Sequence, residues 1–381
     1  MRILHVINRF SAAGAETSLR ELILATTTEI EHAVAVLHSD RNRFDQPGLE
    51  DVTRFVPAAG TPGYLACTRH VSRAIAAFAP DLVHTTLFEA DTAGRVAAHR
   101  AEVPVLTSLV NTPYVPAARQ ARQIPVWKHR AVRLVDRALS RHWTTHFHAI
   151  TQAVADSYVA EFGLDPEVIT VVPRGRDRAR LGEPTPQRRA RVRQSLGIDD
   201  DTPVILAVGR QEAQKGHRFL LEAAPAIARA HPGVRILVAG RPGGMTGALE
   251  RRLEQLALGD DFIFLGFRDD VPDLLVGADL FAFPSLYEGL GGAALEAMAL
   301  GVPTVASDVP ALQEVLDEGR CGVLVPPGDA DALAGACVDL LSSPKRAAAL
   351  AAAGRSRFEA DYSAEAVTHA MLALYRRLAA S

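Results

Sequence analysis

The richest set of chemically capable residues lies in 281–303, where a short apolar run ends at Pro284 and a glycine-rich turn follows. Glu288 lies in that turn, and Glu296 falls one turn inside the helix expected to begin near Gly292. The free amides of a helix N-terminus favour an anion, and carboxylates accept hydrogen bonds from hydroxyl groups. The pattern therefore favours a phosphorylated sugar as ligand. Taken singly, Glu288 is also explained as a helix cap and Glu296 as a solvated helix residue.

Two cations follow another apolar run at 204–208. Gly209 and Arg210 come directly after it, and Lys215-Gly216 follows four residues later, before a further helix. Arg and Lys at the end of a buried strand are costly unless an anionic group meets them. A guanidinium that binds in a bidentate way and a mobile ammonium together suit a diphosphate. The alternative is a solvated turn with a helix cap at Lys215-Gly216.

A third candidate is the loop 8–16, which contains Gly14 and leads through Glu16 into a helix. A small-residue loop that opens a helix lets backbone N–H groups approach an anion. The loop lacks the three glycines of a dinucleotide-binding pattern. A tight turn between a strand and a helix explains it equally well.

Short apolar runs that alternate with helical patterns must position these residues. This alternation is typical of an α/β protein with parallel sheets covered by helices. Helices are expected at 16–27, 65–78, 91–99 and 364–379. Strands are expected at 3–7, 33–37, 82–84, 105–108, 148–150 and 169–172, and again at 204–208, 235–239, 262–265, 280–283, 304–306 and 322–325.

The pattern runs twice along the chain, which predicts two doubly wound domains. Pro, Gly and charged residues replace the apolar periodicity after residue 172, so the linker is placed there. We expect one domain at 1–173, completed by 362–381, and a second at 174–361. Two such domains leave a cleft between the carboxyl ends of their sheets, where ligands of these folds bind.

Composition excludes several classes of protein. The 381 residues carry 41 Lys and Arg against 44 Asp and Glu, so the chain lacks the basic field of a nucleic-acid binder. Its three cysteines have no metal-ligand spacing. Asp-x-Asp spacings at 199–201 and 329–331 fit helix caps better than a cation site, and no metal is predicted. No apolar run reaches the ~18–20 residues of a membrane span, and a cytoplasmic protein is expected.

The stretch 124–143 is amphipathic. Trp127 and Leu134 lie on an apolar face, and Arg130 and Arg137 lie on a basic one. A helix of this kind can bind the surface of an anionic membrane. More often the apolar stripe packs in a core and the arginines are solvated, and both interpretations stay open.

Together these motifs resemble glycosyltransferase family 4, which has the GT-B fold. The resemblance rests on Gly209-Arg210, Lys215-Gly216, Glu288, Glu296 and the run Glu-Ala-Met-Ala-Leu-Gly-Val-Pro ending at Pro303, and it covers nearly the whole chain. It implies a retaining hexosyltransferase-type enzyme that moves a sugar from a UDP- or GDP-sugar to an acceptor hydroxyl by a front-face mechanism. It also implies that no metal or other cofactor takes part, that the acceptor (a small molecule, a glycan or a lipid-linked sugar) binds the first domain, that the donor binds the second, and that the last helix crosses back to the first.

The resemblance also implies residue roles. Arg210 and Lys215 would hold the donor diphosphate and stabilise the departing nucleotide, with Glu288 near the donor sugar and Glu296 at the ribose. Gly291 and Gly292 would approach sugar and phosphate through their amides. Phe267 and Arg268 would meet the nucleobase through their backbone, and Gly14 would approach the β-phosphate. Glu16, which opens the helix after Gly14, would contribute to acceptor binding.

The chain departs from the family pattern in its first half. Val110 stands where many members carry His, Thr86 replaces a second common His, and Ala13 replaces a second glycine. Asn111, or the backbone of Val110, is the hypothesised replacement at the acceptor. Two alternatives therefore stay open: a nucleotide-sugar 2-epimerase of the same fold, and a non-catalytic nucleotide-sugar-binding partner protein.

Overall fold

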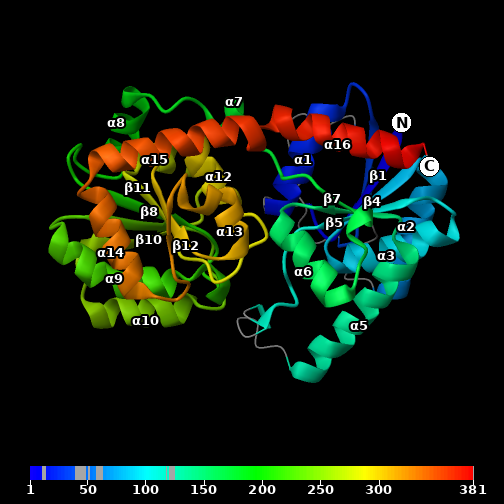
Figure 1. Ribbon diagram of the computed structural model, residues 1–381, viewed down its shortest axis with the longest axis horizontal. Helices are drawn as coiled ribbons and strands as arrows, with labels where there is room; N and C mark the ends of the chain where they lie inside the picture. Colours follow the sequence, from blue (N-terminus) through cyan, green and yellow to red (C-terminus); the bar gives the residue numbers. More distant parts are fainter. Residues whose placement is uncertain are drawn as a thin grey trace. The chain divides into compact units, whose positions relative to one another are not determined.

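The computed structural model describes residues 1–10, 14–38, 49, 52–56, 63–116, 118–119 and 125–380. They form two compact units, each with a parallel sheet covered by helices (Figure 1). The first unit comprises Met1–Val115, Ile124–Arg176 and Ser363–Ser381, and the second contains Asp177–Tyr362. Both are doubly wound α/β folds of the Rossmann type, as the alternation of apolar runs and helical patterns predicts.

The sheet of the first unit has the strand order β3-β2-β1-β4-β5-β6-β7, and every neighbouring pair is parallel. Its strands are β1 (Arg2–Ile7), β2 (Glu31–Val36), β3 (Thr53–Phe55), β4 (Leu82–Thr86), β5 (Val105–Leu109), β6 (His146–Ala149) and β7 (Ile169–Val171). Its helices are α1 (Gly14–Thr26), α2 (Tyr64–Phe78), α3 (Phe88–Arg100), α5 (Val126–Trp143), α6 (Gln152–Phe162) and α16 (Ala364–Ala379).

The sheet of the second unit has the order β10-β9-β8-β11-β12-β13, also parallel throughout. Its strands are β8 (Val204–Val208), β9 (Arg235–Ala239), β10 (Phe262–Gly266), β11 (Leu280–Phe283), β12 (Thr304–Ser307) and β13 (Val323–Val325). Its helices are α7 (Arg178–Leu181), α8 (Pro186–Ser195), α9 (His217–Ala230), α10 (Thr246–Leu256), α11 (Val271–Gly277), α12 (Gly292–Ala299), α13 (Pro310–Val315), α14 (Ala330–Leu341) and α15 (Pro344–Arg357).

The order of strands places the candidate residues. In the second sheet the chain winds outward from β8 in one direction and from β11 in the other, so these two adjacent strands form the switch point. Ligands of open parallel sheets bind at the carboxyl ends of the strands at such a point. The segments after β8 and after β11 are those that carry Arg210, Lys215 and Glu288.

The expected strands are all present, but two elements differ from the sequence-based prediction. The strand β3 was not predicted, because its three residues contain no apolar run and form the edge of the sheet. The polar stretch read as a linker contains the helix α8, whose buried face includes an arginine. Tertiary contacts, rather than an apolar stripe, therefore hold this helix in place.

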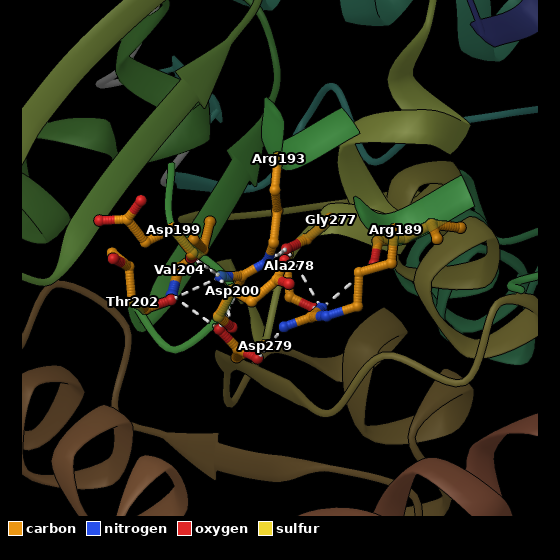
Figure 2. A network of polar contacts seen from close by, with 10 residues as sticks. Arg189, Arg193, Asp199, Asp200, Thr202, Val204, Gly277, Ala278 and Asp279 are labelled. Atoms are coloured by element: carbon orange, nitrogen blue, oxygen red, sulfur yellow. Dashed lines mark hydrogen bonds and ion pairs between the residues drawn. The ribbon is translucent and has the colours of Figure 1, made fainter. Parts of the chain in front are cut away.

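Those contacts form a network around Arg193 and Asp279, which Figure 2 shows. Arg193 is 1% exposed, and its guanidinium donates to Asp279 Oδ2 at 2.7 Å. The other oxygen of the same carboxylate accepts from Arg189 at 2.5 Å. The two arginines also donate to the carbonyl oxygens of Asp199, Asp200, Thr202, Val276, Gly277 and Ala278. These bonds fix α8 to the amino ends of β8 and β11.

The last helix, α16, belongs to the first unit, where it lies beside α1 (Figure 1). Its buried residues Met371 and Tyr375 pack in one core with Ile3, Leu82 and Leu106 of the sheet. The amphipathic pattern of this helix thus buries its apolar face against β1, β4 and β5, in agreement with a terminal helix that returns to the first domain.

The division between the units falls after Arg176 and after Tyr362, a few residues from the expected 173 and 361. Arg176 remains with the first unit because its guanidinium donates to Ser18 Oγ of α1 at 3.1 Å. Its backbone carbonyl accepts from the amide of Ala364 at 3.0 Å. A side chain on the neighbouring Gly175 would lie 2.9 Å from Ala364 Cα, so only glycine allows this approach.

Candidate functional site

The loops after β8 and β11 are pressed together at the switch point of the second sheet. A Cβ on Gly216 would lie 1.9 Å from the carbonyl oxygen of Pro284, so the close approach requires glycine. The amide of Leu286 donates to the Gln214 carbonyl at 2.8 Å, and Gln214 Nε2 donates to the Tyr287 carbonyl at 3.0 Å. Gln214 and Tyr287 are 73 residues apart in the sequence, so these contacts bring two distant segments together.

Lys215 and Glu288 form the centre of this site. Lys215 Nζ donates to Glu288 Oε1 at 2.6 Å, and the side chains are 23% and 8% exposed. The ammonium also lies 5.1 Å from the centroid of the Phe283 ring. A Cβ on Gly209 would lie 3.0 Å from Lys215 Cγ, so the glycine leaves room for the lysine stem. The lysine is thereby oriented at the end of β8 before any ligand binds.

Arg210 supplies a second positive charge at the same strand end. Its side chain is exposed, and no ion pair or side-chain hydrogen bond to it occurs within the described ranges of the chain. A guanidinium in this state can donate two parallel hydrogen bonds to a phosphate without first breaking an internal contact.

The start of α12 adds backbone donors. Gly291, at the N-cap, has φ +91°, and a Cβ there would lie 2.8 Å from Leu312 Cδ2. No side chain caps the helix, so the first amides, beginning at Gly292, stay available to a ligand. Glu296 is half-buried within the same helix. The turn therefore places Glu288 before the free helix N-terminus and Glu296 after it.

The end of β10 contributes an aromatic ring. Gly266 has φ +69°, Phe267 is 54% exposed, and the Arg241 guanidinium lies 4.4 Å from the centroid of the Phe267 ring. The side chain of Arg268 is bound to Asp270, with Nε 2.7 Å from Oδ1. That bond lowers the pKa of the Asp270 carboxyl. The Arg268 side chain is therefore held by an internal partner at the end of β10.

Three further polar residues at this site were missed by the sequence analysis. Ser285 is fully buried and its Oγ has no hydrogen-bond partner, and the same holds for Gln211 Oε1 and His217 Nδ1 among the residues that the structure describes. Burial, followed by the charge of Lys215, lowers the pKa of His217 to about 4, so the imidazole is neutral. Each residue directly follows a predicted motif in the sequence, and this position was the one feature that could have identified it.

The first-domain candidates lie in the other unit. Gly14 is the first residue of α1, and a Cβ on it would meet nothing within 4 Å, so packing does not require a glycine there. Glu16 is buried. Asn111 follows β5, and its Oδ1 accepts from the Thr112 amide at 2.8 Å. Ala13 lies outside the described residues.

The helix α5 overturns one expectation. Its buried residues are Asp136 and Ser140, whereas Trp127 and Leu134 are 73% and 65% exposed. Asp136 faces inward because it pairs with the buried Arg95 at 2.8 Å and accepts from the Tyr114 hydroxyl at 2.6 Å. The interpretation of the apolar stripe as core is therefore wrong. Ile124 of the predicted stretch lies outside the described residues.

The two Asp-x-Asp spacings have different outcomes. Asp329 caps α14, since its Oδ1 accepts from the Ala332 amide at 2.9 Å. The segment 199–201 precedes β8 rather than a helix, so the expected capping role is wrong there, and its carbonyls accept from Arg193 instead. No group of three His, Cys, Asp or Glu side chains suited to a metal ion occurs within the described part of the chain. Helices in that same part are all too short or too polar to cross a membrane.

Comparison with known families covers most of the chain. Residues 188–357 match the model of the glycosyl transferases group 1, and residues 13–175 match the model of a glycosyl transferase 4-like domain. The boundary between the two matches falls close to the division between the structural units.

Individual relatives agree with this assignment. The chain is 30% identical over 286 residues to the 2-deoxystreptamine glucosyltransferase of Streptomyces kanamyceticus, covering 72% of this chain and 73% of the relative. It is 34% identical to a GDP-mannose-dependent monoacylated alpha-(1-6)-phosphatidylinositol monomannoside mannosyltransferase of Corynebacterium glutamicum, but spans only 58% of that protein and 57% of this chain. The structure of Anabaena HepE in complex with UDP-glucose superposes with a TM-score of 0.85 at 22% identity, covering 99% of this chain and 100% of that one.

Proposed function

Because the chain belongs to the family 4-like glycosyltransferases, we propose that it is a retaining glycosyltransferase that moves a sugar from a UDP- or GDP-sugar to an acceptor hydroxyl. The observation that carries the proposal is the Lys215–Glu288 pair at the switch point of the second sheet, beside the unpartnered Arg210. A cationic strand end with a free helix N-terminus is suited to a diphosphate, and a carboxylate there is suited to sugar hydroxyls.

In this proposal the second unit binds the donor. Arg210, Lys215 and the amides at Gly291 and Gly292 hold the diphosphate, and Glu288 accepts hydrogen bonds from the donor sugar. Glu296 accepts hydrogen bonds from the ribose hydroxyls. The backbone at Phe267 and Arg268 meets the nucleobase, with the exposed Phe267 ring as a stacking surface.

The transfer is proposed to proceed on one face of the sugar. The bond between the anomeric carbon and the diphosphate oxygen breaks, and the acceptor oxygen bonds to the same face of that carbon. The acceptor proton passes to the departing phosphate oxygen. Arg210 and Lys215 stabilise the negative charge that develops on the diphosphate, and such preorganised electrostatic stabilisation is usually the largest contribution to catalysis. This route requires no protein nucleophile and no metal ion.

The acceptor is assigned to the first unit. Gly14 is proposed to approach the β-phosphate through its backbone, since packing in the described structure leaves its Cβ position open. Asn111 is proposed to contact the acceptor in place of the family's usual His, which is Val110 here. The Asn111 Nδ2 group is available for this contact because the side chain binds the Thr112 amide through Oδ1.

A peripheral contact with an anionic membrane is proposed through α5. Trp127 and Leu134 expose apolar surface, while Arg130 and Arg141 of the same helix are exposed as well. An exposed apolar stripe flanked by arginines is the arrangement by which amphipathic helices bind anionic lipid. A lipid-linked acceptor would be reached at such a surface, with the enzyme on the cytoplasmic side.

The test is a thermal-shift titration with UDP, GDP, ADP and NAD, followed by a transfer assay. A ligand at about 100 times its dissociation constant stabilises the folded chain by about 2.7 kcal/mol, which raises the melting temperature by several degrees. A shift with UDP or GDP that is unchanged by Mg²⁺ supports the donor site. No shift with any nucleoside diphosphate contradicts it.

The transfer assay separates the alternatives. A new glycoside that retains the anomeric configuration of the donor, observed by NMR, supports the proposal. Epimerisation of the nucleotide-sugar without acceptor would identify the 2-epimerase, and binding without either reaction would identify a non-catalytic partner protein. The absence of the family's usual His, which is Val110 here, disfavours epimerisation, because that reaction requires acid–base groups around the sugar. The intact Lys215–Glu288 pair weighs against a non-catalytic partner protein.

A further inference from the structure

A cavity with mixed polar and apolar walls lies within the first unit, and its lining includes Thr86, the residue that replaces a common His of the family. Its volume is about 40 Å³, and its walls come from α1, the ends of β4 to β6, the loop after β7, and α16. A single water requires about 10–15 Å³ by this measure, so the cavity admits a group larger than one water. Its polar walls include His84, Thr86, Ser108, His148, Arg174 and Thr368.

Two histidines form one wall and are held neutral. His148 Nε2 lies 2.7 Å from the Val172 carbonyl, which can only accept, so this nitrogen carries the proton. His148 Nδ1 therefore accepts from Ser108 Oγ at 2.8 Å, and Ser108 in turn accepts from His84 Nε2 at 2.7 Å. His84 Nδ1 then accepts from the Tyr375 hydroxyl at 2.7 Å. The hydrogen bonds fix both tautomers and leave no imidazole charge in the wall.

Arg174 is the cation of the cavity. It is half-buried, and no hydrogen bond or ion pair to its guanidinium is found among the residues with described positions. Burial, followed by the charge of Arg176, lowers its pKa to about 10, against the opposing effect of Glu16. Burial disfavours the charge of a guanidinium, and an anionic hydrogen-bond partner offsets that cost more fully than the charge of Glu16 does here.

Glu21 also lines the cavity, but its carboxylate pairs with Arg176 and not with Arg174. Its Oε2 lies 3.6 Å from Arg176 NH1, and that same nitrogen donates to Ser18 Oγ at 3.1 Å. The side chains of Thr86 and Thr368 also line the cavity, and neither hydroxyl group has a hydrogen bond to another described residue. The Arg174 guanidinium and the two hydroxyls thus line one cavity, together with the Glu21 carboxylate that lies beside Arg176.

We propose that this cavity binds an oxyanion, a phosphate or carboxylate group, with Arg174 as its cationic ligand and the hydroxyls of Thr86 and Thr368 as further donors. Thr86 on β4 and Ser108 on β5 are partners in the parallel register, so the sheet holds the Thr86 hydroxyl in a fixed position. Thr368 comes from α16, so the bound oxyanion would join the last helix to the sheet. The group is either free phosphate or part of the acceptor, and the second source rests on the proposed function.

The binding test uses inorganic phosphate and the full-length chain. Isothermal titration is carried out with the donor site saturated by whichever nucleoside diphosphate stabilises the protein. R174Q is expected to weaken phosphate binding at least tenfold, since a guanidinium–phosphate contact is a strong charge-assisted bond. T86V and T368V are expected to weaken it by a smaller factor. R251Q, which removes an exposed guanidinium of the second unit outside the candidate site, is the matched control and is expected to retain it.

R174K guards against misfolding as an explanation. It keeps the charge but loses the planar fork, so an intermediate affinity is expected, and circular dichroism verifies that each variant is folded. Equal phosphate affinity of the wild type and a folded R174Q, or no binding by the wild type, would overturn the proposal.

The two sources are distinguished by acceptor kinetics. If the oxyanion belongs to the acceptor, R174Q raises KM for a phosphorylated or acidic acceptor sugar and leaves KM for its neutral counterpart unchanged. If the ligand is free phosphate, both KM values stay the same while phosphate binding is lost. Either result supports the cavity as an oxyanion site. Should no transfer occur at all, the proposed function fails, whereas the titration still decides the cavity.

Discussion

Lys215 Nζ lies 2.6 Å from Glu288 Oε1, and the two side chains come from loops that follow different strands of the second sheet. The pair holds each group in a single orientation with little side-chain freedom left to lose on binding. It also balances the charge of a carboxylate whose side chain is only 8% exposed. Removal of either member therefore leaves the other uncompensated, which is costly for a buried charge.

The first prediction concerns Lys215. Lys215→Ala removes the ammonium that is proposed to stabilise the departing diphosphate, so kcat is expected to fall by roughly 10²–10³-fold, the usual cost of losing one such donor. Because the contact matters most as charge develops, KM for the donor is expected to change less. Steady-state kinetics with the preferred nucleotide-sugar measure both constants.

The exposed Lys345 provides a control of the same residue type in the same unit. Lys345→Ala is expected to keep wild-type kinetics. An unchanged kcat in Lys215→Ala would refute the proposed role of the lysine, whereas a loss in both variants would indicate a general effect on folding.

The sequence predicted those residues of this site that can be recognised from their immediate neighbours in the chain. Arg210, Lys215 and Glu288 each follow a continuous apolar run, and the carboxyl ends of parallel strands lie at one edge of a sheet. That reasoning places them together once β8 and β11 are neighbours, as the structure has them. The 2.6 Å contact of Lys215 with Glu288 itself depends on the close approach of Gly216 to Pro284. No pattern of neighbouring residues in the sequence predicts that approach.

What the sequence could not predict depends on distant partners. Nothing in the sequence distinguishes Ser285 and Gln211, because only their burial in the fold leaves Ser285 Oγ and Gln211 Oε1 without a hydrogen-bond partner. A core position was the more common of the two interpretations of the apolar stripe of α5, because an apolar face normally turns inward, but the buried Arg95 instead pairs with the carboxylate of Asp136. One ion pair thus reverses the orientation that hydrophobic periodicity favours.

A second prediction concerns the backbone at the start of α12. Gly291→Ala places a Cβ 2.8 Å from Leu312 Cδ2 at a residue with φ +91°, so the substitution strains both packing and backbone. Strain of this kind costs of order 1–3 kcal/mol, and the free energy of unfolding is expected to fall by about that amount. Nucleoside diphosphate affinity is expected to fall as well. Chemical denaturation and thermal shift provide the two measurements.

Gly335 supplies the contrast. It lies inside α14 and a Cβ there would meet nothing within 4 Å. Gly335→Ala is therefore expected to stabilise the protein by about 0.5–1 kcal/mol, the gain of Ala over Gly inside a helix. If both glycine variants had the same stability, the special conformation of Gly291 would have no energetic consequence.

A third prediction concerns pH. Burial raises the pKa of Asp91 from 3.8 to about 7, with Arg95 opposing and Asp136 assisting the shift. Because the folded state holds the proton more tightly than the unfolded state, the stabilisation by this proton is full below pH 3.8 and is lost as pH rises towards 7. The free energy of unfolding should therefore fall by up to about 1.4 kcal/mol per pH unit in this window. Denaturant titrations between pH 5 and 8 measure the change.

Asp91→Asn isolates this contribution, since the amide cannot titrate. The buried histidines act with the opposite sign: burial lowers the pKa of His32 and His148 to about 4, so their contribution rises with pH up to 6.5 and is then constant. The difference between wild type and Asp91→Asn removes that background. A pH-independent difference would show that Asp91 is already ionised in the folded protein.

A fourth prediction tests the replacement of the usual His. Asn111→Ala is expected to raise KM for the acceptor and to lower kcat, while donor affinity stays the same because the side chain is proposed to contact the acceptor and not the donor. The loss is expected to be about tenfold, the cost of one or two hydrogen bonds to the substrate. Initial rates at varied acceptor concentration measure it. Wild-type rates in this variant would shift the role to the Val110 backbone.

The last prediction concerns the exposed face of α5. The double substitution Trp127→Ser and Leu134→Ser removes two side chains that are 73% and 65% exposed and is expected to leave folding intact. Their insertion into lipid contributes about 1.5–3 kcal/mol each, so co-sedimentation with anionic vesicles should fall at least tenfold. Arg130→Gln with Arg141→Gln should weaken binding mainly at low salt, at about 1 kcal/mol per charge.

Arg251→Gln, which removes an exposed arginine of the second unit, is the charge-matched control and should bind vesicles as the wild type does. Equal sedimentation with neutral and anionic vesicles would contradict the electrostatic part, and no sedimentation of the wild type would remove the membrane contact altogether.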